Sequence, residues 1–279
     1  MVNFCDKKLA ININIVICLL LIITLAPFFE ANTHIWYIPH PDDETIGMAG
    51  AIHDSVLEGN ENIVVFLTQG KASKVRRKIK VSKEIFGEAR LVESLEALTI
   101  LGVSPENVYV YDYLDGKLKL NEARGVISDF IKRFPNSVHN TVSVFDPHRD
   151  HQTLARALYR EYLESEKALA VNFYRVYIYR QPFNKRVSPF VETIPVRNLS
   201  IKRRALESFT IWDNGFYSIG QQSVPDLIAA AKVSPYEYRD KLVKKSEFWL
   251  KHNIYIVPKT VILPFAAYYL VNMIFRKAS

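Results

Sequence analysis

The chain has 279 residues, with 36 Lys and Arg against 29 Asp and Glu and a formal net charge of +7 at pH 7. Apolar residues make up 49% and charged residues 23% of it, which excludes wholesale disorder and fits one sizeable catalytic domain with short appendages, or at most two small domains. The basic excess is mild and comes with no nucleic-acid-binding motif, so we expect no nucleic-acid partner.

The N-terminal segment is apolar and follows two lysines. Lys7 and Lys8 precede the stretch 15–29, whose length lies between a signal-peptide core and a full membrane span. We predict that residues 1–31 form a signal anchor or a signal peptide, and bulky Phe29 at a position that signal cleavage wants small favours the uncleaved anchor. No Lys or Arg follows until Lys71, so the positive-inside tendency predicts a single N-terminal membrane anchor with the catalytic domain outside the cytoplasm. Secretion after signal cleavage is the alternative.

Strands and helices alternate in the part of the chain that follows. Leucines at 91, 95, 98 and 101 recur at steps of four and three, and Gly102 follows them as a stop signal, which predicts a helix over 84–101. Short β-branched and aromatic runs predict strands over 34–39, 63–68, 108–111, 141–145 and 171–179, with further helices over 49–58 and 123–134. This alternation predicts an α/β fold, a Rossmann-like three-layer sandwich with a mainly parallel sheet, in a catalytic domain over 32–252.

The C-terminal segment 253–279 is also apolar. It is broken by Pro258, Lys259 and Pro264 and ends in a basic tail. It is either membrane-associated or packed on the domain as a closing strand and helix. The two prolines and the lysine argue against a clean membrane span, and so favour packing on the domain or a position in the membrane interface.

Two polar motifs follow predicted strands. His40-Pro41-Asp42-Asp43-Glu44 comes directly after the first strand, and His148-Arg149-Asp150-His151 comes after the fourth. Loops at the carboxyl ends of parallel strands open onto one crevice, so this fold would bring the two motifs together.

The side chains of these motifs are suited to binding a metal ion. A histidine and an aspartate three residues apart can both point at one ion, and the only cysteines, Cys5 and Cys18, lie in the N-terminal segment. Imidazole and carboxylate ligands without sulfur suit Zn²⁺ with an open coordination position. They also suit Fe²⁺ or another divalent cation, so the residue types alone leave the metal open.

Further short motifs accompany these two. They are Thr68-x-Gly70 after the second strand, Arg90-x-x-Glu93 with Leu101-Gly102, and, more weakly, Lys202-x-x-Ala205-Leu206. Together with the two polar motifs they resemble the PIG-L/LmbE-like family of N-acetylglucosaminyl deacetylases, clearly over 35–152. The sequence departs from the usual pattern at Arg149, where the family commonly has proline.

The resemblance implies a role for each site residue. His40, Asp43 and His151 would bind the metal, Asp42 would be the general base, and His148 would face the developing oxyanion, preferably as the imidazolium. Asp150 would hold a histidine in its working tautomer, a role that the chemistry of metal-bound histidine also predicts. Arg90 and Asp115 are candidates for substrate binding, and Glu44 and Glu93 for structural or substrate-positioning roles.

A run of basic residues follows the second strand, at Lys71, Lys74, Arg76, Arg77, Lys78, Lys80 and Lys83. It is either a basic lip that receives phosphate, from a lipid-linked sugar or from membrane headgroups, or a solvated surface segment.

The leading interpretation is a zinc-dependent N-deacetylase that acts on an N-acetylglucosamine-type sugar conjugate, including lipid-linked or wall-associated forms at a membrane. One alternative is a metal amidase acting on another acylated small molecule. The other is a non-catalytic, membrane-tethered glycan-binding protein, which would have no need of a base beside the metal.

Overall fold

The computed structural model describes residues 32–166, 168–213 and 216–242. The predicted N-terminal anchor and the C-terminal segment 253–279 lie outside these residues. Within the described part, no helix is long and apolar enough to cross a membrane.

The described residues form a seven-stranded central sheet in the order β3-β2-β1-β4-β5-β9-β6. The pairs β3–β2, β2–β1, β1–β4 and β4–β5 are parallel, and β9 runs antiparallel to β5. The strands are β1 (Thr33–Ile38), β2 (Glu61–Phe66), β3 (Val108–Val110), β4 (Val138–Val142), β5 (Ala170–Tyr174), β6 (Val191–Pro195) and β9 (Tyr236–Asp240). This order confirms the predicted Rossmann-like, mainly parallel architecture.

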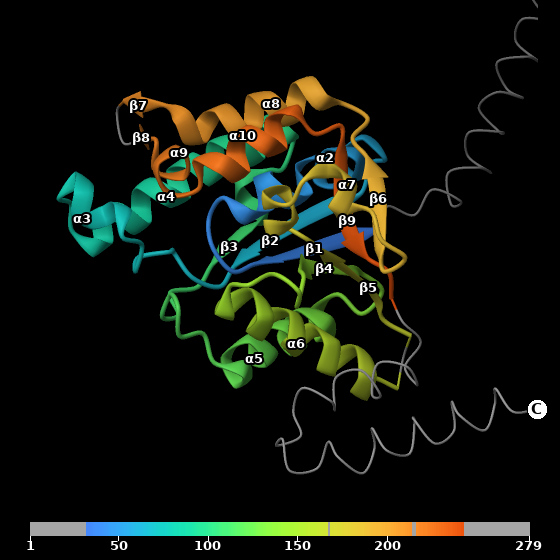
Figure 1. Cartoon of the computed structure of the whole chain (residues 1–279). Helices are drawn as coiled ribbons and strands as arrows, with labels where there is room; N and C mark the ends of the chain where they lie inside the picture. The colour runs from blue at the N-terminus through green and yellow to red at the C-terminus, as the bar shows by residue number, and fades with distance from the viewer. Residues whose placement is uncertain (1–31, 167, 214–215, 243–279) are drawn as a thin grey trace, which may run out of the picture. The chain divides into compact units, whose positions relative to one another are not determined.

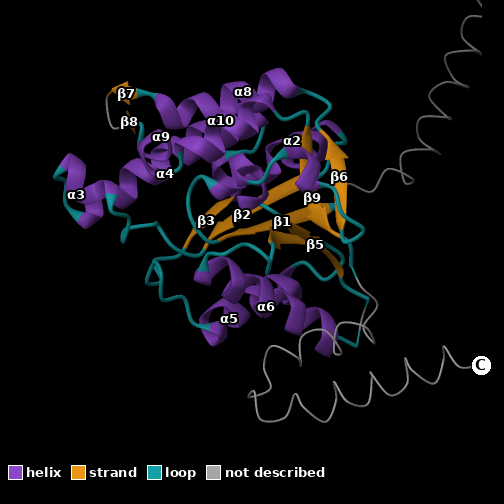
Figure 2. Cartoon of the chain, in the orientation of Figure 1, coloured by secondary structure: helices purple, strands orange, loops and turns teal. Residues whose placement is uncertain are grey.

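Helices cover both faces of the sheet (Figure 1, Figure 2). One face carries α2 (Asp43–Leu57), α4 (Lys83–Leu101), α8 (Leu199–Glu207) and α10 (Pro225–Val233), and the other carries α5 (Leu120–Arg133) and α6 (Arg149–Glu164). Shorter elements are α3 (Val75–Ile79), α7 (Phe183–Arg186), α9 (Ile219–Ser223), the 3-10 turns Pro105–Asn107, Tyr177–Arg180 and Ser208–Thr210, and the hairpin β7 (Trp212–Asp213) and β8 (Phe216–Tyr217). The first face buries an apolar core that includes Trp36, Phe66, Leu98, Leu206 and Ile228.

Helix α4 confirms the strongest sequence prediction. Ser82 caps its start by accepting a hydrogen bond from the Ile85 N–H at 3.2 Å, and Gly102 ends it at φ 94°.

Other element boundaries were predicted less well. Helix α2 begins at Asp43, six residues before the predicted start, so Asp43 belongs to its first turn. Gly47 and Gly50 disfavour a helix, so the sequence pattern did not predict this start. Packing nevertheless requires a small residue here, because a Cβ atom at Gly47 would lie 2.9 Å from Val176. Strands β4 and β5 end three and five residues before the predicted ends, and helix α6, which follows β4, was not predicted.

A buried ion pair joins α8, β9 and α2. Lys202 Nζ lies 2.8 Å from Glu237 Oε1, and the same carboxylate accepts hydrogen bonds from the N–H groups of Gly50 at 2.7 Å and Ala51 at 3.0 Å. Both side chains are fully buried. Lys202, which begins the weakest of the sequence motifs, therefore has a structural role in the fold. It lies far from the two polar motifs in the sequence.

Candidate metal centre and active site

The sheet topology brings the two polar motifs to one point. Strands β1 and β4 are neighbours, and each is followed by one of the motifs. The chain leaves β1 for helix α2 on one face and leaves β4 for helix α6 on the other (Figure 1). Because the two connections turn to opposite faces, a crevice opens between them at the carboxyl ends of the strands.

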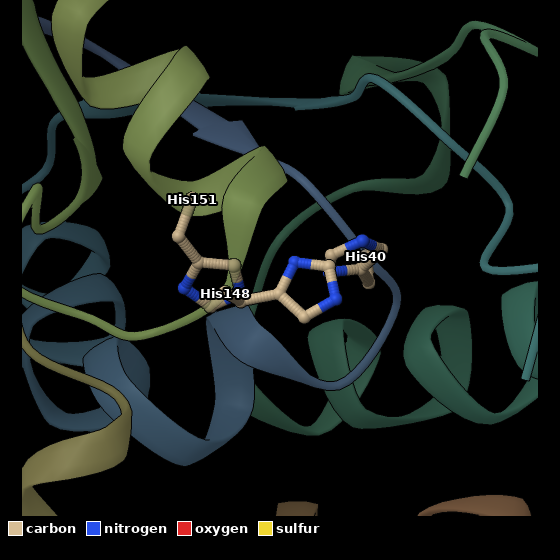
Figure 3. Close-up of side chains that lie close together, drawn as sticks. All are labelled: His40, His148 and His151. Carbon is tan, nitrogen blue, oxygen red and sulfur yellow. The ribbon is translucent and has the colours of Figure 1, made fainter. Parts of the chain in front are cut away.

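Three donor atoms converge in this crevice. Asp43 Oδ2 lies 3.1 Å from His40 Nδ1 and 3.0 Å from His151 Nε2. All three side chains are buried, and Figure 3 shows the imidazoles of His40, His148 and His151 close together. The structure thus brings together the three residues predicted to bind the metal.

The donor set fits a small divalent cation. His151 Nε2 is buried and lies 3.0 Å from Asp43 Oδ2 without forming a well-aligned hydrogen bond to it, which is costly for a polar atom unless something else binds it. Ligand bonds of about 2.0–2.1 Å around a tetrahedral ion place neighbouring donor atoms about 3.3 Å apart, close to the spacing seen here. The residues present therefore suit the metal that the sequence motifs imply.

The other side of the His40 ring faces two carboxylates. His40 Nε2 lies 3.1 Å from Asp150 Oδ2 and 3.3 Å from Asp115 Oδ1. Asp150 also accepts hydrogen bonds from the N–H groups of Gly116 at 2.6 Å and Leu118 at 3.2 Å. These donors occupy the Asp150 carboxylate, so the side of His40 that could hold a cation is the Nδ1 side, where Asp43 Oδ2 and His151 Nε2 lie.

The electrostatics of the centre favour a positive charge there. Burial opposes protonation of His40, but hydrogen bonds to Asp115, Asp150 and Asp43 outweigh it and raise the pKa of this imidazole well above its usual value. Burial likewise opposes ionisation of Asp43, but His151 and His40 hold the pKa of its carboxyl far below its usual range. The carboxylates around the two histidines thus attract a cation.

Asp146 is a site residue that the sequence analysis missed. Its Oδ2 lies 3.0 Å from His151 Nδ1, the nitrogen that faces away from Asp43. Asp146 is buried and stands five residues before His151. The signal that could have found it is a lone aspartate directly after the predicted fourth strand and just before the second motif.

Asp42 supplies a carboxylate beside the donor set. It lines the cavity, and its Oδ2 accepts a hydrogen bond from Arg90 Nη2 at 2.8 Å. Burial raises the pKa of Asp42 to about 7, although the Arg90 guanidinium opposes this shift. Its backbone has φ 116° and ψ −30°, a conformation that a non-glycine residue adopts only when its surroundings impose it.

Arg90 holds Asp42 and the neighbouring loops in place. Besides Asp42 it donates hydrogen bonds to the carbonyl oxygens of Pro41 at 2.5 Å and Gly70 at 3.2 Å. Gly70 has φ 65°, and a Cβ atom there would lie 1.9 Å from Arg90 Nη1. Arg90 lines the cavity, as a substrate-binding residue would, but the contacts that the structure shows all hold the loops that carry the site.

His148 faces the cavity from the start of helix α6. Its ring centroid lies 4.5 Å from that of His40, and its Nδ1 accepts a hydrogen bond from the Asp150 N–H at 3.2 Å. An accepting Nδ1 leaves the proton on Nε2, and burial followed by repulsion from His40 and His151 lowers the pKa of His148. Burial, the largest cause of this shift, therefore favours a neutral donor over the expected imidazolium.

The remaining predicted carboxylates support the loops around the centre. Asp115 lines the cavity, and its second oxygen accepts a hydrogen bond from the Ala72 N–H at 2.7 Å. Glu44 accepts a hydrogen bond from the Asp42 N–H at 3.0 Å, and burial followed by the Asp42 charge raises the pKa of Glu44 to about 8. Glu93 accepts hydrogen bonds from the N–H groups of Tyr217 and Ile219, at 3.1 and 2.9 Å.

His40, Asp43 and His148 line a cavity of about 340 Å³. One wall comes from the loop before α3, with Ser73 and Lys74, and another from Tyr177 after β5. The apolar part of the lining comes from Ile46, Val224 and Leu227. A cavity of this size accommodates a sugar residue with its acyl group.

Comparison with known families agrees with this geometry. Residues 35–162 match the model of the family described as PIG-L, GlcNAc-PI de-N-acetylase. These residues form a PIG-L family domain. No curated protein matches the chain.

Solved structures show the same fold. An N,N'-diacetylchitobiose deacetylase from Pyrococcus horikoshii is 17% identical, covers 77% of this chain and 85% of its own, and superimposes with a TM-score of 0.55. The A40926 pseudoaglycone deacetylase is 14% identical over 77% of this chain and 99% of its own, with a TM-score of 0.55. A 4-carboxy-2-hydroxymuconate hydratase from Pseudomonas putida KT2440 is 17% identical over 76% of this chain and 98% of its own, with a TM-score of 0.51. Deacetylases and a hydratase thus share this fold, so the reaction has to be argued from the site.

Proposed function

We propose that this protein is a metal-dependent N-deacetylase that removes the acetyl group from an N-acetylglucosamine-type sugar conjugate. The observation that carries the proposal is a buried carboxylate, Asp42, that lines a sugar-sized cavity together with His40 and Asp43 of the buried His, Asp and His donor set. The PIG-L domain and the two deacetylases of the same fold support it.

His40, Asp43 and His151 would hold the divalent cation, for which we propose zinc. When bound there, the cation supplies Lewis acidity, which lowers the pKa of water and polarises a carbonyl group.

Asp42 is suited to act as the general base. It lies next to Asp43 in the chain and lines the same cavity, within reach of a water molecule between the donor set and the substrate. As the water oxygen attacks the acetyl carbon, Asp42 accepts the water proton. When the C–N bond breaks, the same carboxyl returns that proton to the amine, and acetate leaves as the second product.

His148 stabilises the charge that develops on the acetyl oxygen. The Asp150 N–H holds Nδ1 as an acceptor, so Nε2 carries a hydrogen that can be donated to this oxygen. A neutral imidazole donates this hydrogen bond without taking up a proton during the step. Asp150 acts on both histidines, since its backbone orients His148 and its side chain orients His40.

Metal analysis with an acetate-release assay tests the proposal. The protein is prepared metal-free and reloaded with Zn²⁺ or Fe²⁺, and acetate is measured from N-acetylglucosamine conjugates. We expect activity only in the loaded forms and loss of both metal and activity in His151→Ala. Bound metal with no acetate released from any N-acetylated sugar would contradict the proposal.

A different acyl substrate is the second candidate function. The hydratase of the same fold shows that this architecture also serves a substrate without an acetamido group. A panel in which released acetate is compared with other released acids separates a sugar deacetylase from an amidase of other acylated small molecules. A glycan-binding protein without catalysis would bind the conjugates and release no acid.

The run of basic residues from Lys71 to Lys83, called the basic segment here, favours an anionic conjugate. Within the described residues Lys71 pairs with Asp112 at 2.8 Å, whereas Lys74, Arg77, Lys78, Lys80 and Lys83 have no acidic partner within ion-pair distance. Lys74 lines the cavity itself, and buried Val75 packs against Phe86 and Ile219, so the segment is anchored next to the site. We propose that it receives a phosphate on the sugar conjugate or its carrier; activity that is indifferent to added salt would contradict this.

We also propose that the N-terminal segment anchors the protein in a membrane with the domain outside the cytoplasm. The apolar stretch ends at Phe29 and β1 begins at Thr33, at the end of the strand opposite to His40. The six strand residues span about 20 Å between Thr33 and the loop that carries His40. Mass spectrometry of the mature N-terminus distinguishes an anchored from a secreted protein.

A further inference from the structure

One buried carboxylate connects the cation donors to the wall of the cavity. Asp146 Oδ2 lies 3.0 Å from His151 Nδ1 and accepts a hydrogen bond from the Val176 N–H at 3.1 Å. Asp146 Oδ1 accepts a hydrogen bond from the Tyr177 N–H at 3.0 Å. Only 2% of Asp146 is exposed, so these three donors take the place of water around its charge.

The contact with His151 determines which ring nitrogen can bind a cation. A carboxylate only accepts hydrogen bonds, so His151 carries its proton on Nδ1 when it faces Asp146. The other nitrogen, Nε2, lies 3.0 Å from Asp43 Oδ2 and is the one that a cation can bind. A carboxylate behind a metal-binding histidine fixes the ring in this way in many metal sites.

The contacts with Val176 and Tyr177 shape the cavity. Tyr177 lines the cavity, and its ring centroid lies 5.4 Å from that of His151. Val176 packs against Gly47 of helix α2, the helix that begins with Asp43. Val176 and Tyr177, whose N–H groups Asp146 binds, therefore contact helix α2 and His151. These two parts of the protein supply two of the three cation donors.

We propose that Asp146 is a positioning residue that couples cation binding to the conformation of the cavity wall at Val176 and Tyr177. A cation on His151 Nε2 fixes the ring, the fixed ring holds the Asp146 carboxylate, and the carboxylate holds the two backbone N–H groups. The inference rests on the metal centre of the proposed function, but its tests require no turnover.

Amide hydrogen exchange of the full-length protein tests the coupling directly. We expect that adding Zn²⁺ to the metal-free wild type slows exchange at Val176 and Tyr177, because their common acceptor becomes better fixed. Exchange at these two amides that does not respond to zinc would overturn the proposal. This measurement uses the wild type, so it does not depend on whether a variant folds.

The variant Asp146→Asn tests the role of the carboxylate. Asparagine has one accepting oxygen for donors on both sides, and its NH₂ group can donate to His151 Nδ1, which moves the ring proton to Nε2. We expect Zn²⁺ affinity to fall about 10- to 100-fold, faster exchange of at least one of the two amides, and loss of the zinc response of the wall. The matched control is Asp129→Asn, which removes an exposed carboxylate paired with Arg133 on α5 and should change none of these quantities.

The outcomes separate this inference from the proposed function. A protein that shows the zinc response but deacetylates no sugar retains the coupling and refutes the deacetylase. If Asp146→Asn binds zinc as tightly as the control and keeps the response of the wall, the coupling is refuted, whatever the enzyme acts on.

Discussion

The substitution Asp42→Asn separates catalysis from metal binding. The amide keeps the size of the carboxyl group, and its oxygen can still accept the hydrogen bond that Arg90 Nη2 donates at 2.8 Å. The cation donors on His40, Asp43 and His151 are unchanged. We therefore expect the variant to fold and to bind metal like the wild type.

Turnover should nevertheless fall steeply, because an amide cannot accept the water proton. General base catalysis contributes about 10²- to 10⁴-fold, which corresponds to about 3–5 kcal/mol of the barrier. The stability change should be much smaller. Exchanging a charged for a neutral hydrogen bond to Arg90 costs about 1 kcal/mol, and removing a buried negative charge next to Asp43 offsets part of it.

The assay measures metal content, acetate release and the free energy of unfolding on the same preparations. Asp129→Asn is again the matched control, since it makes the same chemical change at an exposed position. Metal content that falls in parallel with activity would assign Asp42 to the donor set and refute its role as the base. A loss of turnover below about tenfold would show that another group takes the proton.

Three further substitutions test the scaffold of the site. Lys202→Met leaves the Glu237 carboxylate without its positively charged partner, although the N–H groups of Gly50 and Ala51 still donate to it. Denaturant titrations should show a free energy of unfolding lower by about 3 kcal/mol. A loss below about 1 kcal/mol would contradict the role of the pair. Gly70→Ala should lose about 2 kcal/mol and most activity because it displaces Arg90, whereas Gly59→Ala, also at positive φ but with nothing within 4 Å, should keep its activity. Burial lowers the pKa of His139 from 6.5 to about 4, so the folded protein should lose stability as the pH falls below 6.5, by about 2 kcal/mol from this residue at pH 5. In His139→Gln the loss between pH 7 and pH 5 should be smaller by that amount, and equal losses in both proteins would refute this.

The sequence predicted the parts of the fold that local patterns control. Helix α4 has an apolar repeat, a serine cap and a glycine stop, and each acts within a few residues. Strands β1, β2 and β3 were placed within two residues by their β-branched and aromatic runs. The start of α2 was missed because the packing of Gly47 against Val176 compensates for two glycines that would otherwise disfavour a helix.

The site was predictable where short motifs carry it and not where long-range contacts do. His40, Asp43 and His151 were expected together, and a nitrogen of each histidine lies within 3.1 Å of Asp43 Oδ2. Asp146 was missed because its role depends on a hydrogen bond from the backbone N–H of Val176, thirty residues further along the chain. A single sequence shows neither that pairing nor the hydrogen bond that makes His148 a neutral donor.

The fold and the cavity do not by themselves decide between hydrolysis of an amide and another reaction, since a hydratase shares the architecture. What distinguishes the chemistry is the presence of a base that is not needed to hold the cation. Asp43 lies between His40 and His151, whereas the side chain of Asp42 forms its hydrogen bond within the described residues with Arg90 and lines the cavity. The strained backbone at Asp42 works against stability, and a carboxylate whose purpose was to pair with Arg90 would not require it. The strain is explained if the carboxyl group has to face the cavity, which is the position a general base needs.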